Sequence, residues 1–596
     1  MANYSVQQQP VDTLLSWIRS NEIAIPEIQR PFVWTSTKVR DLIDSLYNGY
    51  PVGYIITWKN PNVKTKDGKL SEGRKVLIDG QQRITALTAA IIGQPVLNKF
   101  YEKERIKIAF HPIEKKFEVL NTAIDKDVSW IKDIGPVVNN ELKITQVIRA
   151  YKSNNEDADE NQIEEAIEEL KSILNKPIGI IELSANLDIE TVTEIFIRIN
   201  REGVVLSQAD FVMSKIAADE KYQGNLLRKF IEYFCHIYVD GEFLDHIKHN
   251  DLEFSSTDFF RKLSWIAKSD DEIYNPQYQD VLRVAYAYKF NRAKFSDLVN
   301  LLSGRNFEKR TYEEEIAAAS YELLKAGIEG FINQTNFERF IMIINSIGFI
   351  SNWFIISKFA LNFAYTLYLK LKDSGYTASE IEYYVKKWFV LSLLTSRYSG
   401  SAETAFDYDI KQINSIGIKQ FLTDVEAANL SDAFWSARVV QDLSTSNIKN
   451  PIFVVYLAQQ ISQNKKGFLS KDITVRDMVV HRGDLHHLFP KELLRTNDFT
   501  RSQYNQVANF VYAQQEINIK IGKKSPDKYF EVIHQQIEKG HAKLGNIIDK
   551  KTLDKNLKDN AIPATLVSAT VADYYDVLNE RKKLMSNAIR QYYESL

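Results

Sequence analysis

Cysteine is almost absent from this sequence of 596 residues, since Cys235 is the only one. A single thiol excludes an internal disulfide framework and a zinc site built from cysteines, and it suits a reducing compartment. An excess of charge of one sign is also missing, because the formal net charge is −2 and the isoelectric point is about 6.6. No global basic field therefore draws the whole molecule to DNA, and contact with nucleic acid must come from local basic patches.

Long uninterrupted hydrophobic runs are lacking too. The most hydrophobic stretch, residues 340–371, is interrupted by Asn345, Asn352, Lys358 and Asn362, whereas a bilayer span needs about 20 mostly apolar residues. We interpret it as a pair of buried helices. The first residues contain no basic segment followed by an apolar one, so we expect no signal peptide. The expectation is a soluble, cytoplasmic protein that does not contact a membrane.

The composition and length of the sequence are typical of a globular protein with several domains. Hydrophobic residues make up 44% of it and charged residues 26%, a balance typical of soluble proteins. At roughly 100–200 residues per domain, the length suggests about three to five domains' worth of chain. The pattern predicts an α+β, multidomain fold: an α/β domain over residues 1–215, a long helical connecting region over 216–450, and a third domain with helices over 451–596.

Alternation and apolar spacing predict individual elements of the first domain. Helices are expected at Val11–Ile18, Ser36–Tyr47 and Gln81–Ile92, the second with a Ser or Thr cap. Strands rich in β-branched residues are expected at Tyr54–Trp58 and Lys75–Ile78. From about residue 208 the pattern is helical almost throughout, because apolar residues recur at three- and four-residue spacing.

Two adjacent histidines stand in the last domain, in the segment Asp484-Leu-His486-His487-Leu-Phe-Pro490. Neighbouring residues of a strand point to opposite faces. In a locally bent hairpin, one imidazole can therefore face a substrate water while the other turns to a metal ion. A nuclease needs both a neutral base that activates water and a divalent cation that neutralises charge on a phosphodiester. The pair therefore predicts a nuclease site.

Further candidates follow the histidines. Asn509 and Asn518 come next, and an amide oxygen is a hard, neutral ligand suited to Mg²⁺ or Mn²⁺. His481 is either a third ligand or a loop residue, and we prefer the loop interpretation. Three lysines form a local basic cluster that could hold DNA phosphates: Lys520, Lys523 and Lys524. The ordered set, with its Phe-Pro and Gly-Lys-Lys-Ser-Pro, is more specific than a bare histidine pair.

Residues 478–535 resemble HNH-type (ββα-metal) nucleases, and most closely the C-terminal nuclease domain of the GmrSD family (domain-of-unknown-function family 1524). Members carry a His-His-Ile-Phe-Pro-like start, then an Asn, then Asn-x-x-Ile-Gly-x-x-Ser-Pro. The resemblance implies that His487 is the general base, that Asn518 is a metal ligand and that Asn509 steadies the hairpin. It makes His486 an atypical metal ligand, because many HNH enzymes have a metal-binding Asp there.

Three segments of the first domain also carry polar residues that suggest chemistry: Ile25-Pro-Glu-Ile-Gln-Arg30, Val76-Leu-Ile-Asp79-Gly80-Gln81-Gln82-Arg83-Ile-Thr85 and Arg198-Ile-Asn200. The second is predicted to be a strand, a glycine turn and a helix start, so that backbone N–H groups face an anion above Gly80. Arg83 and Thr85 would add donors, and Asp79 could hold Mg²⁺ or a ribose hydroxyl. A nucleoside triphosphate fits this pattern. Equally open is a structural ion pair between Asp79 and Arg83.

Residues 8–215 closely resemble the N-terminal domain of GmrSD-type proteins (domain-of-unknown-function family 262), which looks like a ParB-like fold. The three segments occur in the family's order. The resemblance implies NTP binding and hydrolysis, with GTP, UTP and ATP all open. The implied nucleotide-binding residues are Asp79, Gly80, Gln81, Gln82, Arg83 and Thr85, together with Arg30 and Asn200. Residues 388–401 also resemble family sequence, and there we prefer an explanation by helix packing.

Together the resemblances imply a fused GmrSD-type protein, that is, a modification-dependent (type IV) restriction endonuclease that acts against phage. Such an enzyme would recognise modified DNA, use an NTP as a switch, and nick or cut with its HNH domain and Mg²⁺ or Mn²⁺. A homodimer stays open. The alternative is a ParB-like regulatory protein that binds nucleotide and DNA and carries a degenerate nuclease, an idea that the unusual His486 keeps open. A weaker alternative is an RNase that uses the same site.

Overall fold

The structure is a computed structural model, and it describes residues 3–20, 22–24, 32, 34–59, 75–97, 103–184, 187, 208–217, 219, 221–269, 271–481 and 485–596. The chain forms two compact units. Unit 1 comprises residues 1–268 and 298–321, and unit 2 comprises residues 269–297 and 322–596. Helices dominate and the sheets are small, so the predicted α+β, multidomain class is confirmed. The three predicted domain boundaries, and the ParB-like and HNH assignments, stay predictions.

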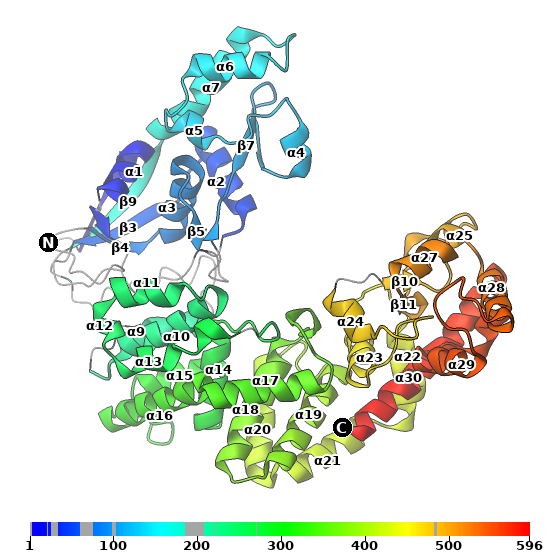
Figure 1. Cartoon of the computed structure of the whole chain (residues 1–596). Coiled ribbons are helices and arrows are strands. Elements are labelled where there is room, and N and C mark those ends of the chain that lie inside the picture. Colours follow the sequence, from blue (N-terminus) through cyan, green and yellow to red (C-terminus); the bar gives the residue numbers. More distant parts are fainter. Residues whose placement is uncertain are drawn as a thin grey trace. The chain divides into compact units, whose positions relative to one another are not determined.

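Unit 1 is built on a mixed five-stranded sheet in the order β1-β9-β3-β4-β2 (Figure 1). Its strands are β1 (Tyr4–Pro10), β2 (Ile23–Ala24), β3 (Tyr54–Lys59), β4 (Lys75–Asp79) and β9 (Pro177–Leu183). β3 runs parallel to β9 and antiparallel to β4. The beginnings of β3 and β9 therefore lie at the same end of the sheet as the end of β4, and that end carries the residues singled out below.

Several helices of unit 1 pack against this sheet in one hydrophobic cluster. Near the sheet lie α1 (Val11–Arg19), α2 (Ser36–Tyr47) and α3 (Gln81–Leu87). Two short hairpins pair β5 (Val96–Leu97) with β6 (Lys103–Glu104) and β7 (Ile108–His111) with β8 (Lys116–Val119). The other helices are α4 (Thr122–Lys126), α5 (Gly135–Val138), α6 (Ile144–Lys152), α7 (Glu160–Lys171), α9 (Gln208–Ala217), α10 (Gly224–Val239), α11 (Phe243–Asn250), α12 (Leu252–Ser255) and α13 (Asp258–Leu263).

The core of unit 1 explains why the helices take these places. Leu14, Ile43 and Leu87 of α1, α2 and α3 are buried in one cluster with Ile55 and Leu77 of the sheet. Burial of such side chains contributes about 1.5–3 kcal/mol each. A second, smaller cluster contains Ile56, Trp58, Ile78 and Leu183. Alternate residues of β3 therefore enter different clusters, as expected for a strand with two apolar faces.

The predicted elements of unit 1 are confirmed with one difference. α2 occupies the predicted range, and the Thr35 hydroxyl accepts a hydrogen bond from the Lys38 amide as its cap (3.4 Å). The helix predicted to run to Ile92 is α-helical only to Leu87 and continues as a π-helix over Thr88–Ile92. The Thr88 hydroxyl donates to the Thr85 carbonyl (3.0 Å), and such side-chain bonds compete with the regular helical ladder.

Unit 2 is almost entirely helical up to a short hairpin near its end (Figure 1). The boundary between the units falls within α15 (Phe295–Leu302) and α16 (Glu314–Ile332). The helices before the hairpin are α14 (Tyr278–Phe290), α17 (Gln334–Ser346), α18 (Lys358–Asp373), α19 (Ala378–Leu394), α20 (Ala402–Ile416), α21 (Ile418–Asn429), α22 (Val439–Asp442), α23 (Pro451–Ser462) and α24 (Val475–Val480). α17 and α18 confirm the predicted helix pair, and among the described residues no helix is long and apolar enough to cross a membrane.

The end of unit 2 packs a small hairpin against helices. The hairpin is formed by β10 (Leu485–His487) and β11 (Phe510–Tyr512). Helices α25 (Lys491–Arg495) and α26 (Arg501–Tyr504) lie between the two strands in sequence, and α27 (Gln515–Ile521), α28 (Pro526–Lys539), α29 (Lys550–Asp559) and α30 (Tyr574–Ser595) follow. α30 packs against α19, α22 and α23 and against the turn at Val507–Asn509. The last helix of the chain thereby supports the loop that leads into β11.

Candidate functional site

The two predicted nuclease histidines lie side by side on β10. In the antiparallel register, His486 pairs with Val511 and His487 pairs with Phe510. His486 is only 8% exposed, whereas His487 is half-buried. The ring of His487 meets that of Phe510 edge to face, with centroids 4.9 Å apart. The alternation of strand side chains thus gives the two imidazoles different surroundings.

His487 is held in one orientation by Asn505, at the end of α26. Its Nε2 lies 3.0 Å from the Asn505 amide oxygen. An amide oxygen only accepts, so with this assignment of the amide Nε2 carries the proton and the lone pair of the neutral ring is on Nδ1. Burial lowers the pKa of His487 below its ordinary 6.5; the bond to Asn505 raises it, and Lys491 and His486 lower it. The net lowering of the pKa of His487 favours the neutral imidazole, which is the form that can accept a proton.

Asn509 ties the two strands of the hairpin together. It is fully buried. Its amide oxygen accepts from the Phe489 N–H (2.9 Å), and its amide nitrogen donates to the carbonyls of Phe489 (3.2 Å) and Tyr504 (3.0 Å). Its own carbonyl accepts from the Leu488 N–H (2.8 Å). These bonds join the segment after β10 to the turn before β11, next to His487.

Three residues outside the predicted motif donate hydrogen bonds to backbone carbonyls of the segment between β10 and β11. Arg581 of α30 is buried and donates to the carbonyl of Ala508 (2.6 Å). Tyr574 donates to the carbonyl of Gln503 (2.7 Å), and Tyr529 donates to the carbonyl of Leu488 (3.2 Å). These side chains satisfy carbonyls that would otherwise be costly to bury. Sequence patterns did not reveal them or Asn505, because their partners lie on other elements.

The remaining predicted residues of this site lie on or beside α27. Asn518 is exposed, and among the described residues its side chain makes no hydrogen bond with either histidine. Lys520, Lys523 and Lys524 are exposed and form no ion pair with a described residue. Lys491, which the sequence analysis did not select, adds a positive charge near His487.

Two more observations bear on a metal at this site. His481 ends α24, and its Nδ1 lies 2.8 Å from the Asp477 carbonyl, an arrangement that agrees with a structural role. Within the described part of the chain, no group of three or more His, Cys, Asp or Glu side chains could hold a metal ion. The predicted metal ligands are the imidazole of His486, which is buried, and the amide oxygen of Asn518, which is exposed. Asp484 lies outside the described residues.

The second predicted site is the turn between β4 and α3. Gly80 has φ +98°, a left-handed conformation that favours glycine. An added Cβ would also lie 3.0 Å from Ile55 Cγ1 and 3.2 Å from its Cα. Both the backbone angle and the close approach to β3 therefore require glycine here. The turn delivers Gln81 directly into the first position of α3.

Arg83 connects this turn to the beginning of β3. Its Nη1 donates to the Tyr54 carbonyl (2.9 Å) and lies 3.6 Å from the Asp79 carboxylate. The ion pair that the sequence left open is thus present, with about a quarter of each side chain exposed. Gln82 is buried, and its amide oxygen accepts from the Trp34 N–H (3.3 Å). Thr85 is half-buried one turn further along.

The structure brings Asp79, Gly80 and Arg83 together with the beginning of β3, and this group agrees both with a structural turn and with an anion site. Arg30, Arg198 and Asn200, which the sequence analysis added to the nucleotide site, lie outside the described residues.

Comparison with known proteins bears on the first part of the chain. Residues 11–217 match the family model described as "GmrSD restriction endonuclease, N-terminal domain". This match confirms the N-terminal resemblance and supports a GmrSD-type restriction endonuclease N-terminal domain here. An uncharacterized protein of Methanocaldococcus jannaschii is 23% identical over 564 residues, which cover 87% of this chain and 86% of that protein. At that coverage the similarity includes residues of both units.

Proposed function

We propose that this chain is an NTP-regulated, modification-dependent DNA endonuclease that acts in defence against phage. The match of residues 11–217 to a restriction endonuclease domain supports a nuclease acting on DNA. The observation that carries the cleavage chemistry is His487: it is half-buried, oriented by Asn505, and has a lowered pKa. A neutral, oriented imidazole next to a supported loop is what a general base requires.

His487 accepts a proton from the attacking water at Nδ1, because its Nε2 proton is engaged by Asn505. Asn509 keeps the loop after β10 in register with β11, and Arg581 holds the carbonyl next to Asn509. Exposed Lys520, Lys523 and Lys524 bind the phosphates that flank the cleaved bond. The residues around His487 thus orient the base, while the lysines on and just after α27 position the DNA strand.

The donors present fit a divalent cation that needs few protein ligands. Held by the imidazole of His486 and the amide oxygen of Asn518, Mg²⁺ or Mn²⁺ would neutralise the charge that develops on the phosphate. Imidazole suits transition metals and an amide oxygen suits hard cations. Because both donors are neutral, phosphate and water oxygens must supply the rest of the coordination. This donor set favours Mn²⁺ over Mg²⁺.

Modification dependence is tested with DNA that differs only in its modification. We expect cells that carry the gene to reduce plaque formation by phages with hydroxymethylated or glucosylated DNA, and the purified chain to cleave that DNA in preference to the unmodified form. The His487→Ala variant is the matched control, since it should lose both effects. Equal cleavage of modified and unmodified DNA would remove the modification dependence but leave the nuclease assignment standing.

The nucleotide part of the proposal rests on the turn at Gly80. We expect Arg83→Ala to reduce NTP turnover at least about tenfold, because one charge-assisted hydrogen bond to a phosphate contributes roughly 1.5–3 kcal/mol. Turnover is measured as phosphate release from GTP, UTP and ATP by the full chain. Asp79→Ala should act in the same direction.

A structural role of the same ion pair predicts a different outcome. In that case, Arg83→Ala would lower the thermal midpoint of unfolding and leave turnover unchanged in the protein that remains folded. Arg40→Ala is a suitable control, because Arg40 also forms ion pairs in unit 1, with Asp41 (2.8 Å) and Glu118 (3.0 Å), away from the Gly80 turn. Turnover in Arg83→Ala and Asp79→Ala equal to that of the wild type would refute the nucleotide site.

A second candidate function is a ParB-like regulatory protein that binds nucleotide and DNA without cutting it. The observation that favours it is the donor set, since among the described residues no group of three or more His, Cys, Asp or Glu side chains could hold a metal ion. Metal titration together with a nicking assay separates the two functions. Comparing RNA with DNA as substrate decides whether the same site serves an RNase.

A further inference from the structure

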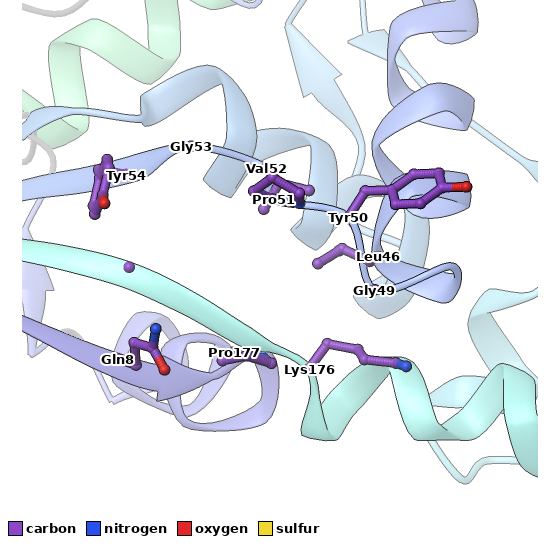
Figure 2. A pocket seen from close by; sticks show the side chains of 11 residues that line it. Gln8, Leu46, Gly49, Tyr50, Pro51, Val52, Gly53, Tyr54, Lys176 and Pro177 are labelled. Atoms are coloured by element: carbon purple, nitrogen blue, oxygen red, sulfur yellow. The ribbon is translucent and has the colours of Figure 1, made fainter.

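An open cavity of about 270 Å³ lies in unit 1 at the end of the sheet where β3 and β9 begin. Figure 2 shows the chain from Gly49 to Tyr54 on one side of it and β1 and β9 on the other. The residues that line it are Gln8, Leu46, Gly49, Tyr50, Pro51, Val52, Gly53, Tyr54, Lys176, Pro177 and Gly179. Neither the nuclease site nor the Gly80 turn accounts for it.

Strand register sets one wall of the cavity. Gly179 of β9 pairs with Gln8 of β1 and with Tyr54 of β3. Paired residues of neighbouring strands point to the same face of a sheet, so Gln8 and Tyr54 flank Gly179 on one face. A Cβ at Gly179 would lie 2.6 Å from the Tyr54 ring. The ring therefore lies directly against the glycine backbone, and the tyrosine is still 53% exposed.

The opposite end of the cavity carries a positive charge. Lys176 precedes β9 and is half-buried. Its Nζ lies 3.9 Å from the position that a Cβ of Gly49 would occupy, so the ammonium group approaches the loop across the cavity. Among the described residues, no carboxylate lies within 4.0 Å of the Lys176 ammonium group, and its charge contributes to the lowered pKa of Glu169. An aromatic face, an exposed amide and an ammonium group thus border one small space.

A nucleotide has parts that match each of these groups. Its base is planar and stacks on aromatic side chains, its edge exchanges hydrogen bonds with an amide, and its phosphate pairs with a cation. Gly53 links the cavity to the nucleotide motif, because it lines the cavity and a Cβ there would lie 2.9 Å from Arg83 Nη2. The cavity and the Gly80 turn therefore share one loop as a common wall.

We propose that this cavity binds one nucleotide, with its base on Tyr54, the base edge at Gln8 and a phosphate at Lys176. This inference rests on the proposed function and goes beyond it, because it adds a nucleotide-binding position that shares a loop with the Gly80 turn. Two sources supply the same chemistry: a free nucleoside triphosphate, or a nucleotide unstacked from a DNA strand. Only the binding experiment below distinguishes them.

The test is equilibrium binding by the full chain, measured by isothermal titration calorimetry. One arm uses ATP, GTP, CTP and UTP with Mg²⁺, and the other uses a single-stranded oligonucleotide in EDTA, so that no cleavage occurs. Tyr54→Ala and Tyr54→Leu should weaken binding about 5- to 150-fold, the range for loss of one base–aromatic stack. Tyr54→Phe keeps the ring and should stay near the wild type. Lys176→Gln should weaken binding and reduce its dependence on salt.

The matched control is Tyr408→Ala, since Tyr408 of unit 2 is 55% exposed and lies outside the cavity. If the Tyr54 and Lys176 variants lose binding only to free nucleotides, the occupant is a free nucleotide. If they lose binding only to the oligonucleotide, the occupant is a nucleotide of a DNA strand. Wild-type binding in both arms by folded Tyr54→Ala, Tyr54→Leu and Lys176→Gln overturns the proposal. Because neither arm measures cleavage or turnover, failure here is distinct from failure of the nuclease or NTPase assignment.

Discussion

Replacing His487 by alanine is expected to lower the rate of divalent-dependent plasmid nicking by about 10²–10⁴-fold, the usual contribution of a general base. The expected loss follows from the position of His487 in the hairpin. His487 is oriented by Asn505 and kept neutral by burial, whereas His486, one residue earlier, is almost fully buried. Nicking is measured as conversion of supercoiled to open-circular DNA with Mg²⁺ or Mn²⁺ over a range of enzyme concentrations.

Two other histidines make this test selective. His534→Ala is the matched control, because His534 is exposed on α28 and lies outside the hairpin. His486→Ala should instead raise the Mn²⁺ concentration that is needed for half-maximal nicking. Nicking by folded His487→Ala at the wild-type rate would contradict the base assignment, whereas absence of divalent-dependent nicking by the wild-type chain would favour the regulatory protein.

The pH profile of the same reaction follows from the direction of the pKa shift. The base is active when neutral, and burial lowers the pKa of His487 below 6.5. The nicking rate should therefore rise with pH through the lowered pKa and be level above pH 6.5. Asn505→Ala removes a hydrogen bond that raises this pKa, so the acidic limb should move to lower pH. An acidic limb centred above 6.5 would contradict the proposed environment of His487.

Replacing Asp409 by alanine is expected to lower the free energy of unfolding of unit 2 by about 3–5 kcal/mol, because it leaves a largely buried guanidinium without its partner. The Asp409 side chain is 0% exposed and receives two hydrogen bonds from Arg397, to Oδ2 (2.6 Å) and Oδ1 (2.5 Å). Tyr398 also donates to Oδ2 (2.9 Å), and Trp388 donates to the Tyr398 hydroxyl (3.1 Å).

This network contains three residues of the segment 388–401, for which the sequence analysis preferred an explanation by helix packing, and it agrees with that interpretation. It joins α19 to α20 through side chains whose hydrogen bonds are mutually satisfied. Chemical unfolding followed by circular dichroism measures the loss. Asp432→Ala is the control, because Asp432 also pairs with an arginine, Arg590 (2.8 Å), but its side chain is 89% exposed. That surface pair should contribute only about 0–1 kcal/mol. A similar decrease in the free energy of unfolding for Asp409→Ala and Asp432→Ala would contradict the larger contribution expected of the buried pair.

Local sequence patterns were sufficient for much of the secondary structure. Apolar spacing and a threonine cap predicted α2 with its observed bounds, and β-branched runs predicted β3 and β4 to within one residue. These features depend on neighbouring residues along the chain, so they can be recognised without a fold. The exception is the end of α3, where the change to a π-helix beside Thr88 is not visible in apolar spacing.

The histidine pair and the Asp79–Arg83 motif could likewise be selected from sequence, because the chemistry of adjacent residues is local. What sequence left open was which role each group takes. His486 and His487 cannot be distinguished by sequence alone. Only the hairpin buries His486 and gives His487 an oriented, neutral ring. In the same way, only the approach of β3 shows that Arg83 binds the Tyr54 carbonyl as well as Asp79.

The sequence by itself therefore determined the α+β class, the main elements of the first unit and the two motifs that carry the proposed chemistry. Tertiary structure alone decided the hydrogen-bond partners: Asn505 for His487, Arg581 for the loop at Asn509, and Asp409 for Arg397. It alone also formed the glycine-lined cavity beside Tyr54. The physical reason is that helix and strand patterns repeat over a few residues, whereas burial, pKa shifts and hydrogen bonds between distant segments exist only after the chain has packed.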